Sequence, residues 1–215
     1  MADIVAISRQ FGSGAARVGR ALAERLGFRY ADRDILAEAA RTLHVDAAEL
    51  EPLEERTASA WERIGALFVL GSPDTPFIPP TLPSVTESEL FTVEQQVIRS
   101  IAANSRAVIV GRGAAHILER SPAVLRVFLH APFPDRVGLA MEEYGFTDRA
   151  AAESVVRESD MTRAKFVKSL TGRDWCDATL YDVTLDTSSV GRAATVDLLA
   201  QIATQQGQAG EAGAR

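Results

Sequence analysis

The sequence predicts an α/β fold in which helices cover both faces of a parallel sheet. Short apolar runs suited to buried strands alternate along the chain with segments whose apolar residues recur at helical spacing. Three polar or glycine-rich motifs come directly after such a run. Ligands of these sheets bind at the carboxyl ends of the strands, so we expect the three motifs to converge on one edge.

Length and composition are those of a single globular domain. The 215 residues suffice for one sizeable core, and 47% of them are hydrophobic and 24% charged. The net charge of -6 argues against a general nucleic-acid-binding surface. Cys176 is the only cysteine, which excludes an internal disulfide and a cysteine-based zinc site. Without a signal peptide or a membrane-spanning apolar run, we expect a cytoplasmic protein with no membrane partner.

The first two expected strands frame one helix. Residues 3–8 open the chain with an apolar run suited to a buried strand. Apolar residues then recur at helical spacing over residues 18–26, and Gly27 ends that helix. Residues 28–30 begin a second short strand, and Asp32 is a suitable N-cap for the helix that follows.

The middle of the chain is less regular up to residue 86. Residues 49–56 form a charged, helical stretch, and residues 71–83 form a proline-rich loop. Thr86 and Glu89 make a capping-box pattern that starts a helix running to about residue 101.

The second half returns to a regular alternation of strands and helices. Strands are expected at residues 107–110, 125–131 and 181–186, and helices at residues 135–144, 147–170 and 191–202. From residue 205 onward the chain is rich in Gln, Gly and Ala, and we expect a disordered tail there.

The first motif, Gly12-Ser13-Gly14, lies between the first strand and the first helix. Glycines let the backbone wrap closely around an anion, and the first helical amides, from Ala15 to Arg17, then point at it. The alternative is a tight turn that needs glycine for its geometry alone. Placement after the first strand of an α/β chain favours phosphate binding.

The loop departs from the full Walker A pattern of phosphate-binding loops. That pattern requires lysine and then serine or threonine after its last glycine, where this chain has Ala15 and Ala16. No lysine precedes Lys165 anywhere in the chain. Three nearby arginines could compensate, unless they only lie on the solvated surface: Arg9, Arg17 and Arg20.

The second and third motifs carry charged side chains after later strands. After the second strand, the carboxylate of Asp32 could accept hydrogen bonds from a base or sugar, and Arg33 could hold a phosphate. The alternative is that Asp32 is only an N-cap, and the residues alone favour this alternative. After the third strand, Arg112 lies between Gly111 and Gly113, which suits bidentate phosphate recognition better than a surface salt bridge.

A group of cations follows in the region expected to be helical from residue 147. On a mobile helix pair these cations could close over a nucleotide and neutralise the transferred charge. The alternative is an exposed charged helix. The group comprises Arg157, Arg163, Lys165, Lys168 and Arg173. The three histidines, His44, His116 and His130, lack metal-type spacing and are interpreted as structural or surface residues.

These motifs together resemble cytidylate kinases, and more closely the divergent cytidylate kinase-like family. The resemblance covers nearly the whole chain except the tail and is vaguest across residues 44–86. In the first part of the chain it rests on Ile7-Ser8-Arg9-Gln10-Phe11-Gly12-Ser13-Gly14, Val18-Gly19-Arg20-x-Leu22-Ala23 and Tyr30-x-Asp32. In the rest of the chain it rests on Val108-Ile109-Val110-Gly111-Arg112-Gly113, Asp160-x-x-Arg163, Thr171-Gly172-x-Asp174-Trp175, Tyr181-Asp182 and Asp186-Thr187-Ser188.

The resemblance implies a P-loop NTPase-like domain at residues 1–204, with a five-stranded parallel sheet. A nucleoside-monophosphate-binding insert would occupy residues 33–100, a helical lid residues 145–175, and the tail residues 205–215. By resemblance, Arg112 contacts the acceptor phosphate, Asp32 lies in the acceptor site, and Arg157 and Arg163 grip the transferred phosphoryl group.

The resemblance further implies ATP and Mg²⁺ as cofactors and transfer of the γ-phosphoryl group to a nucleoside monophosphate, CMP or dCMP. Nucleotides would then be its small-molecule partners. Two other functions stay open. Ala15 and Ala16 favour a nucleotide-sensing module that binds without turnover, and a third possibility is a small-molecule kinase with another acceptor.

Overall fold

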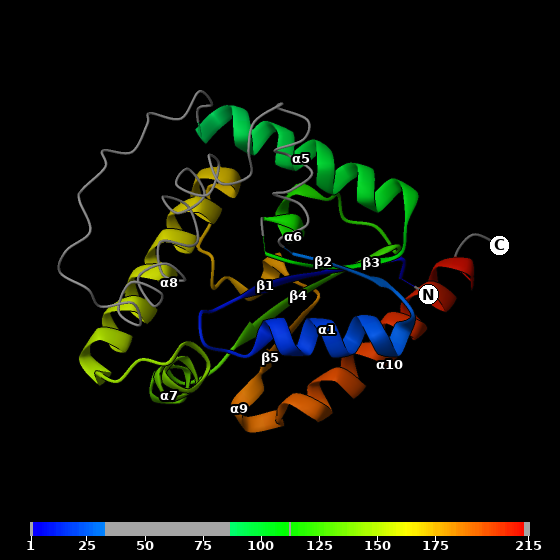
Figure 1. The fold of residues 1–215 in the computed structure, drawn as a ribbon. Helices are drawn as coiled ribbons and strands as arrows, with labels where there is room; N and C mark the ends of the chain where they lie inside the picture. The colour runs from blue at the N-terminus through cyan, green and yellow to red at the C-terminus, as the bar shows by residue number, and fades with distance from the viewer. Residues whose placement is uncertain (1, 33–86, 112, 213–215) are drawn as a thin grey trace.

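The computed structural model describes residues 2–32, 87–111 and 113–212, and these residues form one parallel five-stranded sheet. The strand order is β2-β3-β1-β4-β5, and Figure 1 labels the five strands. The strands are β1 (Ile4–Arg9), β2 (Arg29–Ala31), β3 (Ala107–Val110), β4 (Val124–His130) and β5 (Val183–Asp186). This confirms the α/β fold with a parallel sheet.

Helices cover both faces of the sheet because alternate strand residues point to opposite sides. Ile4 and Ala6 of β1 belong to the hydrophobic cluster beneath α5 (Glu87–Asn104) and α6 (Ala114–Ile117). Val5 and Ile7 belong to the cluster on the other face, with α1 (Ala15–Leu26) and α10 (Arg192–Ala212). Figure 1 shows α5 above the sheet and α1 with α10 below it. Burial on both faces explains why β3 and the first four residues of β1 are continuous apolar runs.

Two further helices pack against each other at the carboxyl edge of the sheet. α7 (Phe133–Tyr144) and α8 (Arg149–Thr171) share a third hydrophobic cluster with Phe11 of the glycine loop. The carboxylate of Asp148 caps α8 by accepting from the amides of Ala150 and Ala151. The sequence suggests a mobile helix pair for the cation group. In the structure, all the cations of that group before Gly172 lie on the single helix α8.

The C-terminal end of the chain differs from its expectation. After η2 (Ala178–Leu180) and the short α9 (Thr187–Val190), α10 continues to Ala212, whereas the sequence predicts a disordered tail from residue 205. The alanine and glutamine residues of this segment are good helix formers, whereas Gly207 and Gly210 are not. The side chain of Gln206 also donates to the carbonyl of Val124 at 3.3 Å.

Several expected elements lie outside the described residues, namely the helix capped at Asp32 and everything expected between residues 33 and 86. Across the residues that are described, no helix combines the length and the apolar character needed to cross a membrane.

Candidate functional site

The glycine loop between β1 and α1 exposes backbone amides at the carboxyl edge of the sheet. Gly12 and Gly14 have φ of 75° and 71°, in the left-handed region that favours glycine. α1 begins at Ala15, and no side chain caps it. Within the described parts of the chain, nothing accepts a hydrogen bond from the amides of Gly14, Ala15 or Ala16. A helix N-terminus in this state is suited to an anion.

Three hydrogen bonds hold the loop in place, one within the loop and two to neighbouring segments. The hydroxyl of Ser13 donates to the carbonyl of Gln10 at 2.9 Å. The buried hydroxyl of Thr187 donates to the carbonyl of Ser13 at 2.8 Å. The side-chain oxygen of Gln10 accepts from the amide of Ala131 at 3.3 Å. The loop is therefore preorganised rather than dependent on a ligand for its shape.

A buried ion pair contacts the main chain of the loop at Phe11. Arg136 of α7 and Asp160 of α8 are 2.6 Å apart, with side chains 6% and 19% exposed. The guanidinium of Arg136 also donates to the carbonyl of Phe11, and the carboxylate of Asp160 accepts from the amide of Phe11. Both main-chain polar groups of Phe11 are thus satisfied by one pair of charges.

Gly12 is needed at its position for a second reason. A Cβ there would collide with the carbonyl oxygen of Arg136, so the loop and α7 approach more closely than any other residue would allow.

A cavity of about 440 Å³ opens beside the loop, between α7 and the α9–α10 junction. Its floor includes Gly12 and Ser13. Leu139 of α7 and Arg192 of α10 line it from two sides, each within 3.4 Å of where a Cβ on Gly14 would lie. A planar group could therefore lie between the side chains of Leu139 and Arg192, next to the loop amides.

Two arginines meet on the opposite side of the loop. The guanidinium of Arg9 lies against Gly111, where a Cβ would collide with it. The guanidinium of Arg163 lies 5.7 Å from the ring centroid of Phe11 and donates to the hydroxyl of Ser159 at 2.6 Å. Burial lowers the pKa of Arg163 to about 9, and the charge of Arg9 acts in the same direction.

The other candidate arginines face elsewhere. Arg17 pairs with Glu143 of α7 at 2.8 Å and is 51% exposed. Arg20 stacks on the ring of Tyr30 at 4.8 Å, and Arg157 stacks on Phe133 at 4.2 Å. These contacts do not bring Arg157 together with Arg163, although the resemblance gives the two residues the same role.

The acceptor-side candidates are described only in part. The hydroxyl of Tyr30 donates to the carboxylate of Asp32 at 3.1 Å. Burial, and then the charge of Asp32, raise the pKa of Tyr30 to about 12, so the phenol keeps its proton. Arg33 and Arg112 lie outside the described residues, as does the helix that Asp32 is expected to cap.

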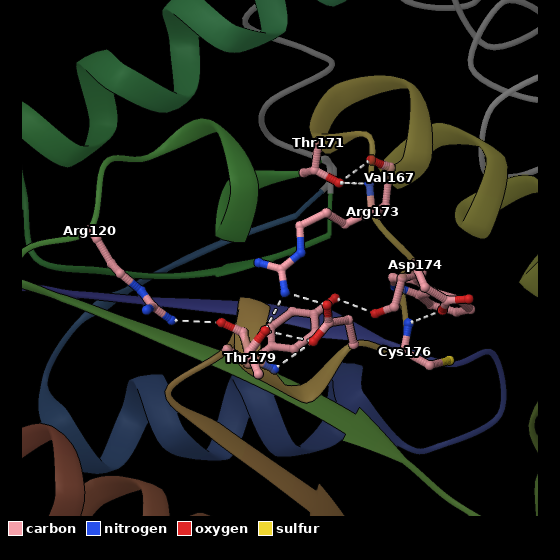
Figure 2. A network of polar contacts seen from close by, with 10 residues as sticks. Arg120, Val167, Thr171, Arg173, Asp174, Cys176 and Thr179 are labelled. Atoms are coloured by element: carbon pink, nitrogen blue, oxygen red, sulfur yellow. Dashed lines mark hydrogen bonds and ion pairs between the residues drawn. The ribbon is translucent and has the colours of Figure 1, made fainter.

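The cations at the end of α8 do not join the site by any contact described. Figure 2 shows Arg173 turned toward the loop after α8, where its guanidinium contacts Asp177 and Thr179. Its amide donates to the hydroxyl of Thr171 at 3.1 Å. Lys165 and Lys168 are exposed. This network fastens the end of α8 to η2.

A second polar network lies beneath the end of β1. The indole of Trp175 donates to the hydroxyl of Ser8 at 3.1 Å, and the hydroxyl of Tyr181 donates to the carbonyl of Trp175 at 2.9 Å. Burial, helped by the charge of Arg126, lowers the pKa of His116 to about 4, and this imidazole lies 3.4 Å from the Tyr181 hydroxyl. A neutral histidine here agrees with a structural role.

No metal site is found among the described residues, where no group of three or more histidine, cysteine or acidic side chains could hold an ion. The alanine at residue 16 has no oxygen to offer Mg²⁺. Among the described residues, the side chains around the loop thus include no such group.

Arg136 and Asp160 are the residues that sequence reasoning missed as loop ligands. In the sequence, Asp160 belongs to the motif Asp160-x-x-Arg163, and Arg136 is one charged residue of an expected helix. Neither position predicts a bond to the main chain of Phe11, because α7 and α8 must first pack against the loop.

The sheet order and the glycine loop after the first strand define the class: this is a P-loop kinase fold. The chain belongs to the cytidylate kinase-like family, whose model matches residues 4–189. No curated protein sequence matches the chain significantly.

Solved structures with the same fold share little sequence with this chain. An uncharacterized protein from Eubacterium ventriosum is 20% identical, with a TM-score of 0.65 over 94% of this chain and 98% of its own. A shikimate kinase from Bacteroides thetaiotaomicron is 13% identical, with a TM-score of 0.52 over 93% and 97%. The protein TT1252 from Thermus thermophilus is 18% identical, with a TM-score of 0.51 over 94% and 96%.

Proposed function

We propose that this protein transfers the γ-phosphoryl group of ATP to a nucleoside monophosphate, with CMP or dCMP as the acceptor. The observation that carries the proposal is the preorganised loop of Gly12, Ser13 and Gly14, whose amides face the carboxyl edge of a parallel sheet beside a cavity. Membership of the cytidylate kinase-like family supports the reaction class.

The donor nucleotide would bind on the side of the loop where β4 and β5 lie. Its phosphates would accept hydrogen bonds from the amides of residues 12–17, aided by the dipole of α1. Its base would enter the cavity between Leu139 and Arg192. A cavity of about 440 Å³ has the size of an ordinary small-molecule site.

The acceptor would bind on the other side, at the ends of β2 and β3. Asp32, held by Tyr30, offers a carboxylate for the base or sugar. Arg33 and Arg112 are proposed phosphate ligands because of their places after these strands. Arg163 and Arg157 remain the proposed cations for the transferred group, and only Arg163 lies against the loop.

Mg²⁺ would arrive with ATP rather than on the protein, as the described side chains supply no ligand set for it. The ion would neutralise phosphate charge during transfer. The residues of this chain would position the two nucleotides in line and donate hydrogen bonds to the phosphoryl oxygens.

A coupled ADP-release assay over a panel of acceptors tests the proposal. We expect turnover with CMP or dCMP, and thermal stabilisation by ATP because a ligand of the folded state raises its stability. Gly14→Asp, which places a carboxylate at the loop, should remove the stabilisation. If no nucleotide stabilises the wild type, and Gly14→Asp behaves like it, the proposal is wrong.

A nucleotide-sensing module is the second candidate. It is favoured by Ala15 and Ala16, which remove a cation and a metal ligand from the loop but leave its amides in place. Stabilisation by ATP with no ADP release for any acceptor would establish this function instead. ADP release with a different small-molecule acceptor would establish a kinase of other specificity.

A further inference from the structure

Arg9 is a partly buried cation at the carboxyl edge where the proposed reaction takes place. It is the last residue of β1, and its guanidinium lies over Gly111, just after β3. Gly111 has φ of 84° and no Cβ, which leaves room for it. Within the described parts of the chain, no carboxylate pairs with Arg9 and no group accepts a hydrogen bond from it.

Arg163 brings a second guanidinium close to the first. It reaches from α8 to the ring of Phe11, two residues after Arg9. The carboxylates that attract it, Asp160 and Asp32, are already engaged, by Arg136 and by Tyr30. Burial is the main cause of the lowered pKa of Arg163, and the charge of Arg9 adds to it, which places the two guanidinium groups near each other.

The sheet order places this pair where the γ-phosphoryl group of a bound donor would end. The cavity lies toward β4 and β5, the loop amides follow β1, and the contact between Arg9 and Gly111 bridges β1 to β3. A nucleotide with its base in the cavity and its phosphates along the loop would therefore extend toward Arg9, and then toward the acceptor side at β3 and β2.

The competing candidates have other partners. Arg17 pairs with Glu143, and Arg20 stacks on Tyr30. A purely structural Arg9 would be expected to satisfy its donors with carboxylates or carbonyls, as Arg136 does with Ala131, Phe11 and Asp160.

We propose that Arg9 supplies the cation that lysine provides in other phosphate-binding loops, and that Arg9 and Arg163 together hold the γ-phosphoryl oxygens during transfer. This inference rests on the proposed function. An oxygen of the acceptor phosphate bonds to the γ-phosphorus while the bond to the β,γ-bridging oxygen breaks, and ADP leaves with that electron pair. The guanidinium N–H groups donate to the three peripheral oxygens throughout, and Arg9 itself gains or loses no proton.

Calorimetric titration with AMP-PNP and with ADP tests the role of Arg9. AMP-PNP carries a γ-phosphoryl group that does not transfer, and ADP lacks it. We expect Arg9→Gln to weaken AMP-PNP binding by about 10- to 100-fold, as for the loss of a charge-assisted hydrogen bond, and to leave ADP binding nearly unchanged. Arg9→Lys keeps the charge but loses the planar set of guanidinium donors, so its affinity for AMP-PNP should lie between those of Arg9→Gln and the wild type.

A matched control comes from the opposite edge of the same two strands. Arg106, just before β3, pairs with Asp3 at 3.1 Å and is 58% exposed. Arg106→Ala should change neither affinity. Thermal unfolding without ligand adds a second readout, because removing one of two neighbouring cations should leave the midpoint of Arg9→Gln unchanged or raised, whereas loss of a structural arginine would lower it.

The outcomes separate the inference from the proposed function. Equal losses for AMP-PNP and ADP, or unchanged affinity for both, would overturn the role of Arg9 while nucleotide binding stands. A lowered unfolding midpoint together with unchanged affinities would make Arg9 structural. If the wild type binds neither nucleotide, the proposed function fails, and the inference fails with it.

Discussion

The ion pair between Arg136 and Asp160 makes the sharpest prediction for stability, because it holds the glycine loop from α7 and α8 at once. Asp160→Ala leaves the guanidinium of Arg136 buried without its carboxylate and the amide of Phe11 without its acceptor. Breaking a buried pair by removing one partner costs about 3–5 kcal/mol. In a domain of this size each kcal/mol shifts the melting temperature by about 2–4 °C, so we expect a fall of about 6–20 °C.

Urea and thermal unfolding followed by circular dichroism measure this loss of stability. Two further variants serve as comparisons. Asp160→Asn keeps an oxygen acceptor for Phe11 but not the charge, so its loss should be smaller. Asp3→Ala removes an exposed pair with Arg106 at 3.1 Å and should cost less than about 1 kcal/mol. If Asp160→Ala costs no more than Asp3→Ala, the pair does not hold the loop and the reasoning is refuted.

Three other predictions concern the proposed anion sites and one half-buried histidine, His116. If Arg9 has replaced the P-loop lysine, the double replacement Ala15→Lys with Ala16→Ser should raise turnover little, and a large increase in kcat would instead indicate a degenerate loop. Arg112→Ala should weaken CMP binding by the equivalent of about 1.5–3 kcal/mol and spare ATP, and equal losses in titrations with each would contradict an acceptor role. His116 should stay neutral down to about pH 4 in an NMR titration. Because its pKa in the unfolded chain is higher, its contribution to stability is present above about pH 6.5 and is lost as the pH falls toward 4. A measured pKa near 6.5 would contradict the partial burial of its imidazole.

The strands and the glycine loop could be predicted because their signals are local. Residues 107–110 are four consecutive buried apolar residues, and they form β3 with the expected bounds. Gly12 and Gly14 lie within five residues of the end of the first strand, and both take the positive φ that the loop requires. Apolar runs and glycine turns carry this information within a few residues, so no partner needs to be known.

The arrangement of the charges could not be predicted, since it depends on helices that are distant in the sequence. Arg157 and Arg163 lie on the same helix, yet one stacks on Phe133 and the other approaches Phe11. Their spacing of six residues turns them to different sides of an α-helix. Arg173 is near them in the sequence, but the helix ends before it, at the left-handed Gly172, so it contacts the following loop.

The hydrogen bond between Trp175 and Ser8 gives this protein an internal optical reporter. The indole is only 3% exposed and donates to the hydroxyl that directly precedes Arg9 in the chain. Indole emission responds to nearby charge and to its hydrogen bond, and the chain has one other tryptophan, Trp61. A Trp61→Phe variant would therefore emit from Trp175 alone. In a stopped-flow experiment, its fluorescence would report the binding of a nucleotide phosphate near the end of β1, without any label on the nucleotide.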